Sequence, residues 1–375
     1  MKTALKKLAP RRRTFPIARK LAALRGRKAA LIYTHDNPDP DSIAAAWGLA
    51  RLFRHELDIP STIAHGGIVG RAQNRAMIDT LRIKMVGTDG LDTDAFDLIA
   101  LVDSQPETGN NSLPLGHRID VVIDHHPLRP ACGRAPWGDV REELGATSTI
   151  ILEYLHARHV PIDPALATAF FFALRTETRD LGREATEKER RAYLSLVSAV
   201  DHGLLYRMTH PKVPRAHFAA LDRALRSAEV FGNIVAVNLG RLRYPDLVAE
   251  IADLLLSYEA AELVLCVGRY DDAVYLSLRT EPTRKRAGAI MRAIVGTSGA
   301  AGGHGTMAGA RLHAKVRSSR ALDDEFRRLV ARLCAEVGTD TTHSTLLLAP
   351  PPSPIFEEGE GEADGGNPTE GRGSG

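Results

Sequence analysis

Acids and histidines gather at three places between residues 35 and 126 of this 375-residue chain. Residues 35–41 read His-Asp-Asn-Pro-Asp-Pro-Asp, Asp103 stands alone, and residues 124–126 read Asp-His-His. Carboxylate oxygens and imidazole nitrogens are ligands for divalent first-row ions such as Mn²⁺ and Mg²⁺. Carboxylates held close together also repel one another unless a cation stands between them. These residue types therefore point to a divalent metal centre and to chemistry assisted by metal ions.

Each cluster follows an apolar run that predicts a buried strand. The runs cover residues 28–33, 97–102 and 118–123. Unbroken runs of Val, Ile and Leu are typical of strands buried on both faces of a parallel sheet, and ligands bind at the carboxyl ends of such strands. The three clusters should therefore converge at one sheet edge. A polar loop that caps the next helix would explain the first cluster alone, but not its recurrence at three strand ends.

Helical and strand patterns alternate along most of the chain. Further strands are expected at 61–64, 234–239, 262–267 and 273–279, and helices at 42–56, 71–81, 148–158, 164–174, 186–202, 246–258, 287–295 and 321–334. Ser42 is the expected N-cap of the first of these helices, and the glycine-rich residues 299–305 are expected to form a loop. The alternation predicts an α/β fold with two domains, the larger N-terminal one built on a doubly wound, mainly parallel sheet, and the active site in the cleft between them.

The domain boundaries follow from changes in composition. We expect a basic N-terminal arm, a first α/β domain, a helical connector, a smaller second α/β domain and a disordered acidic tail, at residues 1–27, 28–200, 201–232, 233–337 and 338–375. The tail is assigned from its Pro, Gly and Glu content and its lack of periodicity.

Charge is unevenly distributed along the chain. Residues 1–28 hold eleven Lys or Arg and no acid, whereas residues 356–375 hold six acids and one Arg. The net charge of +3 therefore leaves −3 for the rest, so the folded part is not itself a basic nucleic-acid-binding domain. The basic start could contact RNA, a membrane surface or an acidic partner, or it could be a solvated helical arm.

The remaining composition predicts a cytoplasmic protein without membrane association. No apolar run approaches the ~20 residues that span a bilayer, and no secretory signal segment is evident. Cys132, Cys266 and Cys334 lie far apart and form no CxxC motif. Such isolated thiols are typical of a reducing compartment.

The ordered motifs resemble those of the DHH phosphoesterase superfamily. His-x-Asn-Pro-Asp-x-Asp at 35–41, the strand-terminal Asp103 and Asp-His-His at 124–126 are similar to its first three motifs. Residues 302–304, Gly-Gly-His, resemble the GGH loop of the accompanying domain in the RecJ-like and nanoRNase–pAp phosphatase branches. Asp-His-His alone is weakly specific, but the ordered set at strand ends with GGH downstream is highly specific.

The resemblance implies two Mn²⁺ ions per active site, with Mg²⁺ or Co²⁺ as alternatives. By carry-over, one ion would be held by His35 and Asp39 and the other by Asp41 and His125. Asp103 would bridge the pair. Residues 28–200 would then be the catalytic domain, in which two metals activate water for attack at phosphorus.

Four further residues receive roles from the same resemblance. His126 would face the phosphate or orient a ligand, and Asp124 would lie behind the histidines and fix their ring orientation. The family usually has Asp in its fourth motif, where this chain has Glu177, which is one methylene longer. We expect Glu177 to complete the metal site, with Asp180 as its rival.

The second domain, residues 233–337, would hold the substrate. Gly302 and Gly303 would let backbone N–H groups approach a phosphate closely, and His304 would add a hydrogen bond. Arg279 could grip a second phosphate or a terminal base, or could be a solvated surface arginine.

These features together predict a manganese-dependent phosphoesterase acting on short oligonucleotides or small nucleotides, similar to nanoRNase or pAp phosphatase. The alternatives are a nucleotide-binding regulatory module that has lost catalysis and a RecJ-like single-strand exonuclease. A family II pyrophosphatase ranks lower because that family typically lacks the GGH motif. RNA contact through the basic start and a homodimer stay open.

Overall fold

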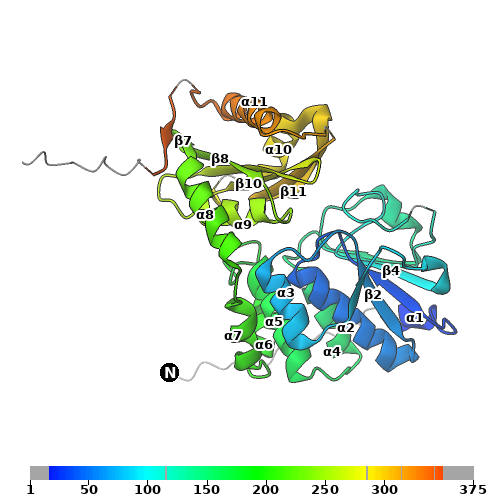
Figure 1. Cartoon of the computed structure of the whole chain (residues 1–375). Coiled ribbons are helices and arrows are strands. Elements are labelled where there is room, and N and C mark those ends of the chain that lie inside the picture. The colour runs from blue at the N-terminus through cyan, green and yellow to red at the C-terminus, as the bar shows by residue number, and fades with distance from the viewer. Residues whose placement is uncertain (1–16, 115, 284–285, 314, 342, 349–375) are drawn as a thin grey trace, which may run out of the picture.

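The fold is taken from a computed structural model of the whole chain, and the structure described covers residues 17–348 except 115, 284–285, 314 and 342. The side chain of His304 also lies outside the described part, although its backbone belongs to a strand. Two layered α/β halves share the chain, one above the other in Figure 1. Within the described residues, no helix is long and apolar enough to cross a membrane.

The first half is built on a six-stranded sheet in which every neighbouring pair is parallel. The strands follow the order β3-β2-β1-β4-β5-β6. Their bounds are β1 (Ala30–Tyr33), β2 (Ser61–His65), β3 (Met85–Gly87), β4 (Leu98–Val102), β5 (Val121–Asp124) and β6 (Trp137–Val140). The chain leaves β1 for β2 on one side and later returns to β4 on the other. The order of the strands therefore reverses between β1 and β4, where α/β sheets bind their ligands.

Helices cover one face of this sheet. Ala30 and Ile32 of β1 point into a core shared with the long helices α2 (Pro40–Leu57), α4 (Thr147–Ala157) and α5 (Pro164–Glu177). Leu31 and Tyr33 point to the other face, which is covered by loops and by two short 3₁₀ turns, η1 (Thr93–Ala95) and η2 (Pro130–Arg134). The remaining helices are α1 (Ile17–Ala22), α3 (Ala72–Leu81), α6 (Glu187–Leu196) and α7 (His202–Thr209).

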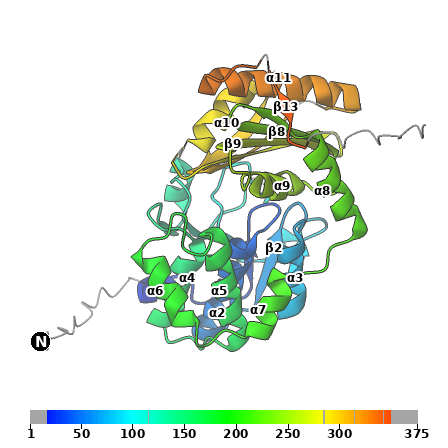
Figure 2. The same ribbon diagram turned by 90° about the vertical axis from the view of Figure 1, so that its left-hand side faces the viewer.

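Helix α8 (Arg215–Ser227) connects the halves, and a seven-stranded mixed sheet follows in the order β11-β12-β10-β9-β8-β7-β13. Only β8 and β9 pair in parallel. The bounds are β7 (Glu229–Phe231), β8 (Ile234–Arg241), β9 (Leu263–Tyr270), β10 (Ala273–Thr280), β11 (Gly299–His304), β12 (Met307–Leu312) and β13 (Thr345–Leu346). Helices α10 (Ala287–Val295) and α11 (Ser319–Val337) pack on one face, with η3 (Gly296–Ser298) after α10. Helix α9 (Leu247–Leu255) packs with α8 on the other and lies between this sheet and the first half (Figure 2).

The predicted α/β class and the parallel first sheet are confirmed, and every predicted strand and helix is present. The structure adds β3, β6 and β12, whose sequences are short and partly exposed. Such segments carry too little apolar periodicity to be predicted, since their pairing partners lie elsewhere in the chain. The end of the expected helical connector is also a strand, β7. The predicted helix at 186–202 is shorter, because α6 ends at Leu196 and α7 begins only at His202. The proposed domain boundaries themselves stay a prediction.

The start of α2 differs from the expectation for Ser42. Asp39 is the N-cap: its carboxylate accepts from the backbone N–H of Ser42, and the Ser42 hydroxyl accepts in turn from the N–H of Asp39. Pro40 therefore occupies the first helical position, where its fixed φ is favourable and its missing N–H costs nothing. The prolines on either side of Asp39 start the helix rather than delay it.

The glycine-rich segment is an edge strand and not the expected loop. Residues 299–304 pair antiparallel with β12, with Gly302 opposite Gly309. At Gly303 φ is +141°, and a Cβ there would lie 2.3 Å from the carbonyl oxygen of Met307. Only glycine fits this backbone and this close approach. These glycines therefore allow the strand to pair closely with β12. From the sequence alone, such a glycine-rich segment suggests a turn.

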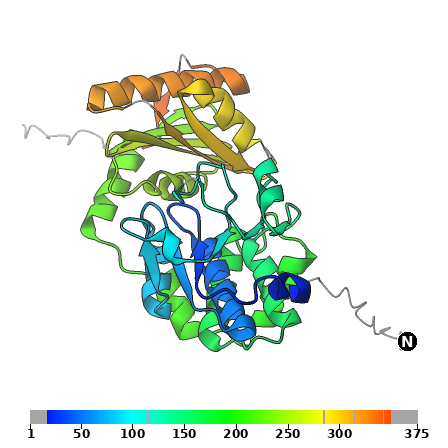
Figure 3. The ribbon, with the colours of Figure 1, turned by 90° about the vertical axis from the view of Figure 1, so that its right-hand side faces the viewer.

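Parts of both terminal segments are also ordered. Ile17 and Leu21 of α1 are buried in the first core, so residues 17–27 are not a solvated arm (Figure 3). Thr345 pairs with Val230 of β7, which places β13 in the second sheet rather than in a disordered tail. Residues 1–16 and 349–375, the rest of the predicted arm and tail, lie outside the described part.

Candidate metal centre

The first two clusters meet where the strand order reverses. The loop after β1 carries His35 and Asp39, and the adjacent strand β4 ends on Asp103. Asp103 is 2% exposed and adopts a left-handed φ of +57°. Such a backbone costs roughly 1–3 kcal/mol for a residue other than glycine and is found where a side chain must be aimed precisely for function. The end of β4 therefore directs this carboxylate into the site.

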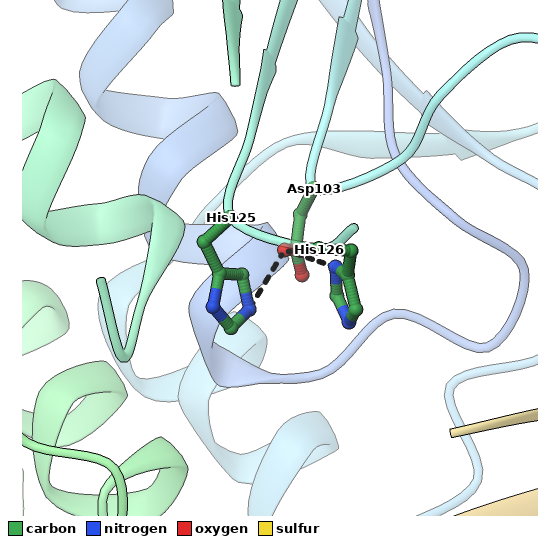
Figure 4. Close-up of side chains that lie close together, drawn as sticks. All are labelled: Asp103, His125 and His126. Carbon is green, nitrogen blue, oxygen red and sulfur yellow. Dashed lines mark ion pairs between the residues drawn. The ribbon is translucent and has the colours of Figure 1, made fainter. Parts of the chain in front are cut away.

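Asp103 is the common member of two donor sets, and Figure 4 shows the one it forms with His125 and His126. Its Oδ2 lies 3.6 Å from Nε2 of His35, which is itself 3.7 Å from Oδ1 of Asp39. Its Oδ1 lies 3.6 Å from Nε2 of His125 and 3.7 Å from Nδ1 of His126. Within each set the ligand atoms lie within 4.8 Å of one another. This geometry suits two cations that share one carboxylate.

Acid–imidazole contacts shift the pKa of both partners in the first set. Burial would lower the pKa of His35, but the hydrogen bond and charge of Asp39 outweigh burial and raise it to about 10. Burial would likewise raise the pKa of Asp39, and His35 instead holds it well below its usual range. A divalent cation would replace the imidazolium charge, because both side chains offer lone pairs to it once His35 is neutral.

The two histidines of the third cluster are oriented by different partners. Asp124 Oδ1 lies 2.9 Å from Nδ1 of His126, whereas Nδ1 of His125 lies 3.1 Å from the carbonyl oxygen of Leu144. Asp124 therefore holds the His126 ring directly and also accepts from the backbone N–H of His125. Burial opposes ionisation of Asp124, yet its bonds with His126 lower its pKa to about 2. Hydrogen-bond partners of this kind hold metal ligands in place.

Gln105 anchors this arrangement from behind. Its Nε2 donates to Asp124 Oδ2 at 2.6 Å and to the carbonyl oxygens of His126 and Pro127, and it is 1% exposed. Its Oε1 accepts from the backbone N–H of Arg129. The amide thus links Asp124 to the loop that carries both histidines.

Asp41 is buried and lies at the amino end of α4. Its two oxygens accept from the backbone N–H groups of Thr147 and Ser148 at 2.7 and 2.9 Å. The helix has no side-chain cap of its own, so Asp41 replaces one. Burial and the neighbouring charge of Asp103 raise the pKa of Asp41 well above its usual value. A cation nearby would favour its ionised form.

The structure separates the two candidates of the fourth motif. Asp180 is 60% exposed and pairs with Arg175 at 2.5 Å, away from the cluster. Glu177 is 16% exposed, and the charges of Asp39 and Asp103 act on it. Burial, followed by Asp39, raises the pKa of Glu177. Glu177 is thus the half-buried one of the two and interacts electrostatically with Asp39 and Asp103, whereas Asp180 is exposed and pairs with Arg175. That Glu177 completes the metal site stays a prediction.

The loop of the first cluster is held rigidly by its neighbours. Asp36 accepts from the backbone N–H and the hydroxyl of Ser112. Asn37 accepts from the N–H of Ile68 at 2.9 Å, and Asn74 donates to the carbonyl of Pro38 at 3.0 Å. These contacts fix the backbone between His35 and Asp39.

The second half contributes less directly. Arg279 is 6% exposed, and its Nε donates to Asp253 of α9 at 2.6 Å, so it is not the solvated arginine of the alternative reading. Gly302 and Gly303 lie in the edge strand β11. The side chain of His304 is outside the described part, so its proposed phosphate contact stays a prediction.

A cavity of about 340 Å³ opens between the halves beside His125. Its lining joins the third cluster to the turn after β11: His125, Pro127, Glu142, Glu143, Leu144, Glu184 and Gly305. Gly305 has a φ of +49°, and a Cβ there would lie 1.8 Å from Oε1 of Glu184. Only glycine allows this contact between the halves. Three carboxylates thus border this side of the centre.

Sequence reasoning missed Gln105, Arg179, Arg183 and Asp253. Arg179 and Arg183 flank the expected fourth motif, and proximity to Glu177 was the one signal that could have marked them. Gln105 and Asp253 carry no local motif, because their partners lie at least 19 residues away in sequence.

Known proteins share this sequence and fold. An uncharacterised protein of Methanocaldococcus jannaschii is 32% identical over 302 residues, 80% of this chain and 61% of that protein. The A-adding tRNA nucleotidyltransferase of Geobacter sulfurreducens is 25% identical over 346 residues, 88% of this chain and 38% of that protein. The chain thus spans 61% and 38% of the length of these two relatives.

The fold of both halves recurs in a solved structure. An exopolyphosphatase-related protein of Bacteroides fragilis superposes with a TM-score of 0.64 at 14% identity, over 85% of this chain and 96% of that one. Residues 29–174, which hold β1 to β6 and both donor sets, match the model of the DHH family, N-terminal domain. Residues 29–174 therefore match the family that the motifs at 35–41, 103 and 124–126 resemble.

Proposed function

We propose that this protein is a metal-dependent phosphoesterase that hydrolyses phosphodiester or phosphomonoester bonds of short oligonucleotides or small nucleotides. The observation that carries the proposal is the position of Asp103, whose two oxygens face separate donor sets. A shared carboxylate is the arrangement that holds two cations close together. The match of residues 29–174 to the DHH family supports the same reading.

The two donor sets would hold two divalent ions, with Asp103 common to both. His35 and Asp39 would hold one ion, and Asp41 and His125 the other. His126 is the third member of the second set, whereas Asp41 belongs to neither set and accepts from the backbone at the start of α4. Glu177 would complete the set as a longer carboxylate. When bound, such a pair supplies charge to offset the phosphate and activates water for in-line attack at phosphorus. Oxygen and imidazole donors favour Mn²⁺, with Mg²⁺ and Co²⁺ as alternatives.

The surrounding side chains have separate tasks. Asp124 holds the His126 ring through Nδ1, so His126 is presented to the substrate phosphate with a fixed orientation. Thr147 donates its hydroxyl to Oδ1 of Asp103 at 2.8 Å and so restrains the shared carboxylate. In the second half, Arg279 and the backbone of Gly302 and Gly303 would hold a terminal phosphate or nucleotide.

The charges beside the centre favour a small substrate. Glu142, Glu143 and Glu184 border the cavity next to His125, so a long polyanionic strand would meet three carboxylates on that side. Arg71, Arg179 and Arg279 instead meet at Asp253. A dinucleotide or a bisphosphorylated nucleoside would need only a few such contacts. This observation disfavours the RecJ-like exonuclease alternative.

A substrate panel tests the proposal. The full-length protein is incubated with Mn²⁺, Mg²⁺ or Co²⁺ and a dinucleotide, adenosine 3′,5′-bisphosphate, pyrophosphate or longer single strands. We expect Mn²⁺-dependent release of mononucleotide or phosphate from the two small nucleotides. Turnover should fall by at least about a hundredfold in Asp103→Asn, since even residues that only orient ligands contribute up to about that much. Asp180→Asn is the matched control and should resemble the wild type.

Failure of the panel has a defined meaning. If the dinucleotide binds but no substrate is hydrolysed with any metal, the protein is not a phosphoesterase. The alternative, a regulatory nucleotide-binding module, is then favoured. Preferential hydrolysis of long strands would instead favour the exonuclease.

We also propose RNA contact through the basic N-terminal residues, on the evidence of their charge and of the partial match to a tRNA nucleotidyltransferase. Deleting residues 1–16 should abolish RNA association while leaving dinucleotide turnover intact. Association that survives the deletion would rule out this tether.

A further inference from the structure

Asp253 of α9 is surrounded by arginines from three separate segments. Its Oδ1 accepts from Nε of Arg279 at 2.6 Å and also from Nη2 of Arg179. Its Oδ2 lies 3.8 Å from Nη2 of Arg71. Arg71 and Arg179 belong to the first half and Arg279 to the second, so one carboxylate joins the two halves. We call these three residues the arginine cluster.

The cluster holds more positive charge than Asp253 alone can balance. Three guanidinium groups face one carboxylate, and Arg183 also acts electrostatically on Arg179 and Arg279. Asp246, Glu250 and Asp39 also act electrostatically on Arg71, whereas Asp253 is the acid with which Arg179 and Arg279 form ion pairs. Guanidinium groups that converge from three segments are the usual binding site for phosphate, which accepts more hydrogen bonds than a carboxylate.

A strained turn delivers Arg179 to this position. Arg179, Asp180 and Leu181 all have positive φ, at +47°, +53° and +67°. Such a run in residues other than glycine persists only where the surroundings enforce it, and it marks functional positions. The turn follows directly on Glu177, so the same few residues serve the donor sets and the arginine cluster.

The cluster also lies next to the metal centre. Arg71 interacts with Asp39 of the first donor set as well as with Asp253. Arg183 lies 3.7 Å from Oε1 of Glu177 and contacts the sulfur of Met307 across the interface. Arg71 therefore links the arginine cluster to the first donor set.

We propose that the arginine cluster is a second phosphate-binding site and that Asp253 is its resting occupant, which a substrate phosphate displaces. This proposal rests on the proposed function for the identity of the substrate. Asp253 is 30% exposed, so its side chain can rotate out without unfolding α9. Asp253 is thus a positioning residue that sets specificity. When its side chain moves away from the arginines, only a substrate with a second phosphate can replace the lost ion pairs.

The first test compares two substrates that differ by one phosphate. Turnover of a 5′-phosphorylated dinucleotide and of the same dinucleotide without that phosphate is measured with Mn²⁺ in the wild type, Asp253→Asn and Arg179→Gln. Because the internal competitor is gone, Asp253→Asn should lower the KM for the phosphorylated substrate by about five- to tenfold, within the usual range of coupling between two ligands. The kcat should change much less, so the kcat/KM ratio between the substrates rises. Arg179→Gln should lower that ratio.

The second test does not depend on turnover. Inorganic phosphate is titrated into the full-length protein by calorimetry in the absence of divalent metal. Asp253→Asn should bind it at least about fivefold more tightly than the wild type, and Asp253→Asn with Arg179→Gln should lose that gain. Asp222→Asn on α8 removes an equally charged but exposed residue, paired only with Arg226 in the described structure, and should leave binding unchanged.

The outcomes separate this proposal from the proposed function. If no substrate is hydrolysed but Asp253→Asn binds phosphate more tightly than the wild type, the proposed enzyme function is wrong and the proposed phosphate site stands. Weaker or equal phosphate binding by Asp253→Asn would show that Asp253 supports the arginines structurally, and the proposal would be wrong. Should that variant not fold, unchanged phosphate binding by Arg179→Gln would overturn it equally.

Discussion

Individual carboxylates in this site have different neighbours and therefore different tasks. Asp103 faces both donor sets, and Asp41 accepts two backbone N–H groups. Asp124 bonds to the His126 ring and accepts from the backbone N–H of His125. Gln105 stands one step further out and still determines where Asp124 points. A side chain without ligand chemistry can therefore control the metal centre through its hydrogen bonds.

Gln105→Leu tests this at the residue scale. Leucine keeps a similar volume but cannot donate to Asp124, so a buried carboxylate oxygen loses its partner. We expect a 10- to 100-fold loss of metal affinity or turnover and roughly 1–3 kcal/mol of lost stability. Mn²⁺ titration and denaturant unfolding measure the two effects. Metal affinity equal to the wild type would show that His126 alone fixes Asp124.

Two helices at the element scale begin on side chains of the metal centre. Asp39 caps α2 through the reciprocal bonds with Ser42, and Asp41 caps α4. The acids of residues 35–41 therefore have two roles. They accept from unpaired backbone N–H groups at helix starts, and they also face the donor sets. Stability and metal binding are coupled at these positions.

Ser42→Ala separates the capping role of Asp39 from its proposed role as a metal ligand. Removing the Ser42 hydroxyl breaks the capping box but leaves the Asp39 carboxylate in place. Each of Ser42→Ala and Asp39→Ala should lose about 0.5–2 kcal/mol of unfolding free energy in EDTA. Only Asp39→Ala should lose Mn²⁺ affinity as well. If Ser42→Ala loses metal affinity to the same degree, capping and ligation cannot be separated.

A second element-scale contact makes stability depend on pH. Asp139 of β6 binds Arg141 at 2.8 Å and accepts from Tyr154 of α4. Burial would raise the pKa of Asp139, but the bonds from Arg141 and Tyr154 lower it below 3.8. A lowered folded-state pKa gives stability that is present above the unfolded value and is lost as the pH falls through the folded value.

Asp139→Asn should therefore flatten the acid limb of stability. The wild type should lose more unfolding free energy than this variant between about pH 5 and pH 2, because asparagine takes up no proton there. Chemical unfolding at a series of pH values measures the difference. Parallel curves for the two proteins would contradict the assignment.

The whole molecule places its site by bringing two halves together across α9. Contacts of Arg179, Arg71 and Arg183 with the second half hold the interface beside the metal centre. At the other end of the first half, α1 adds buried Ile17, Leu21 and Leu24 to the core. The segment that charge alone marked as an arm is therefore partly a structural element.

Two truncations test this division of the N-terminus. Removing residues 1–16 leaves α1 in place, so the melting temperature should stay closer to the full-length value than it does after the longer deletion. Removing residues 1–27 also deletes three buried side chains, each contributing about 1.5–3 kcal/mol, and the ion pair of Arg27 with Asp120. It should lower the melting temperature strongly or prevent folding. Equal melting temperatures for the two truncated proteins would show that α1 does not stabilise the fold.

The sequence by itself determined the strands, the ligand types and their convergence. Parallel strands end at one edge, so His35, Asp103 and His125 had to meet once their apolar runs were identified. It also ranked Glu177 above Asp180 as a ligand, and this stays a prediction, although Asp180 is exposed and Glu177 is largely buried.

Tertiary structure alone decided which partner each side chain has. The cap of α2, the strand at 299–304, the anchor Gln105 and the arginines around Asp253 all depend on groups that are close in space. Hydrogen bonds and ion pairs act over a few ångströms and leave no period in the sequence, whereas burial of strands and helices does. Local pattern therefore reveals which elements meet, and only packing fixes the contacts between them.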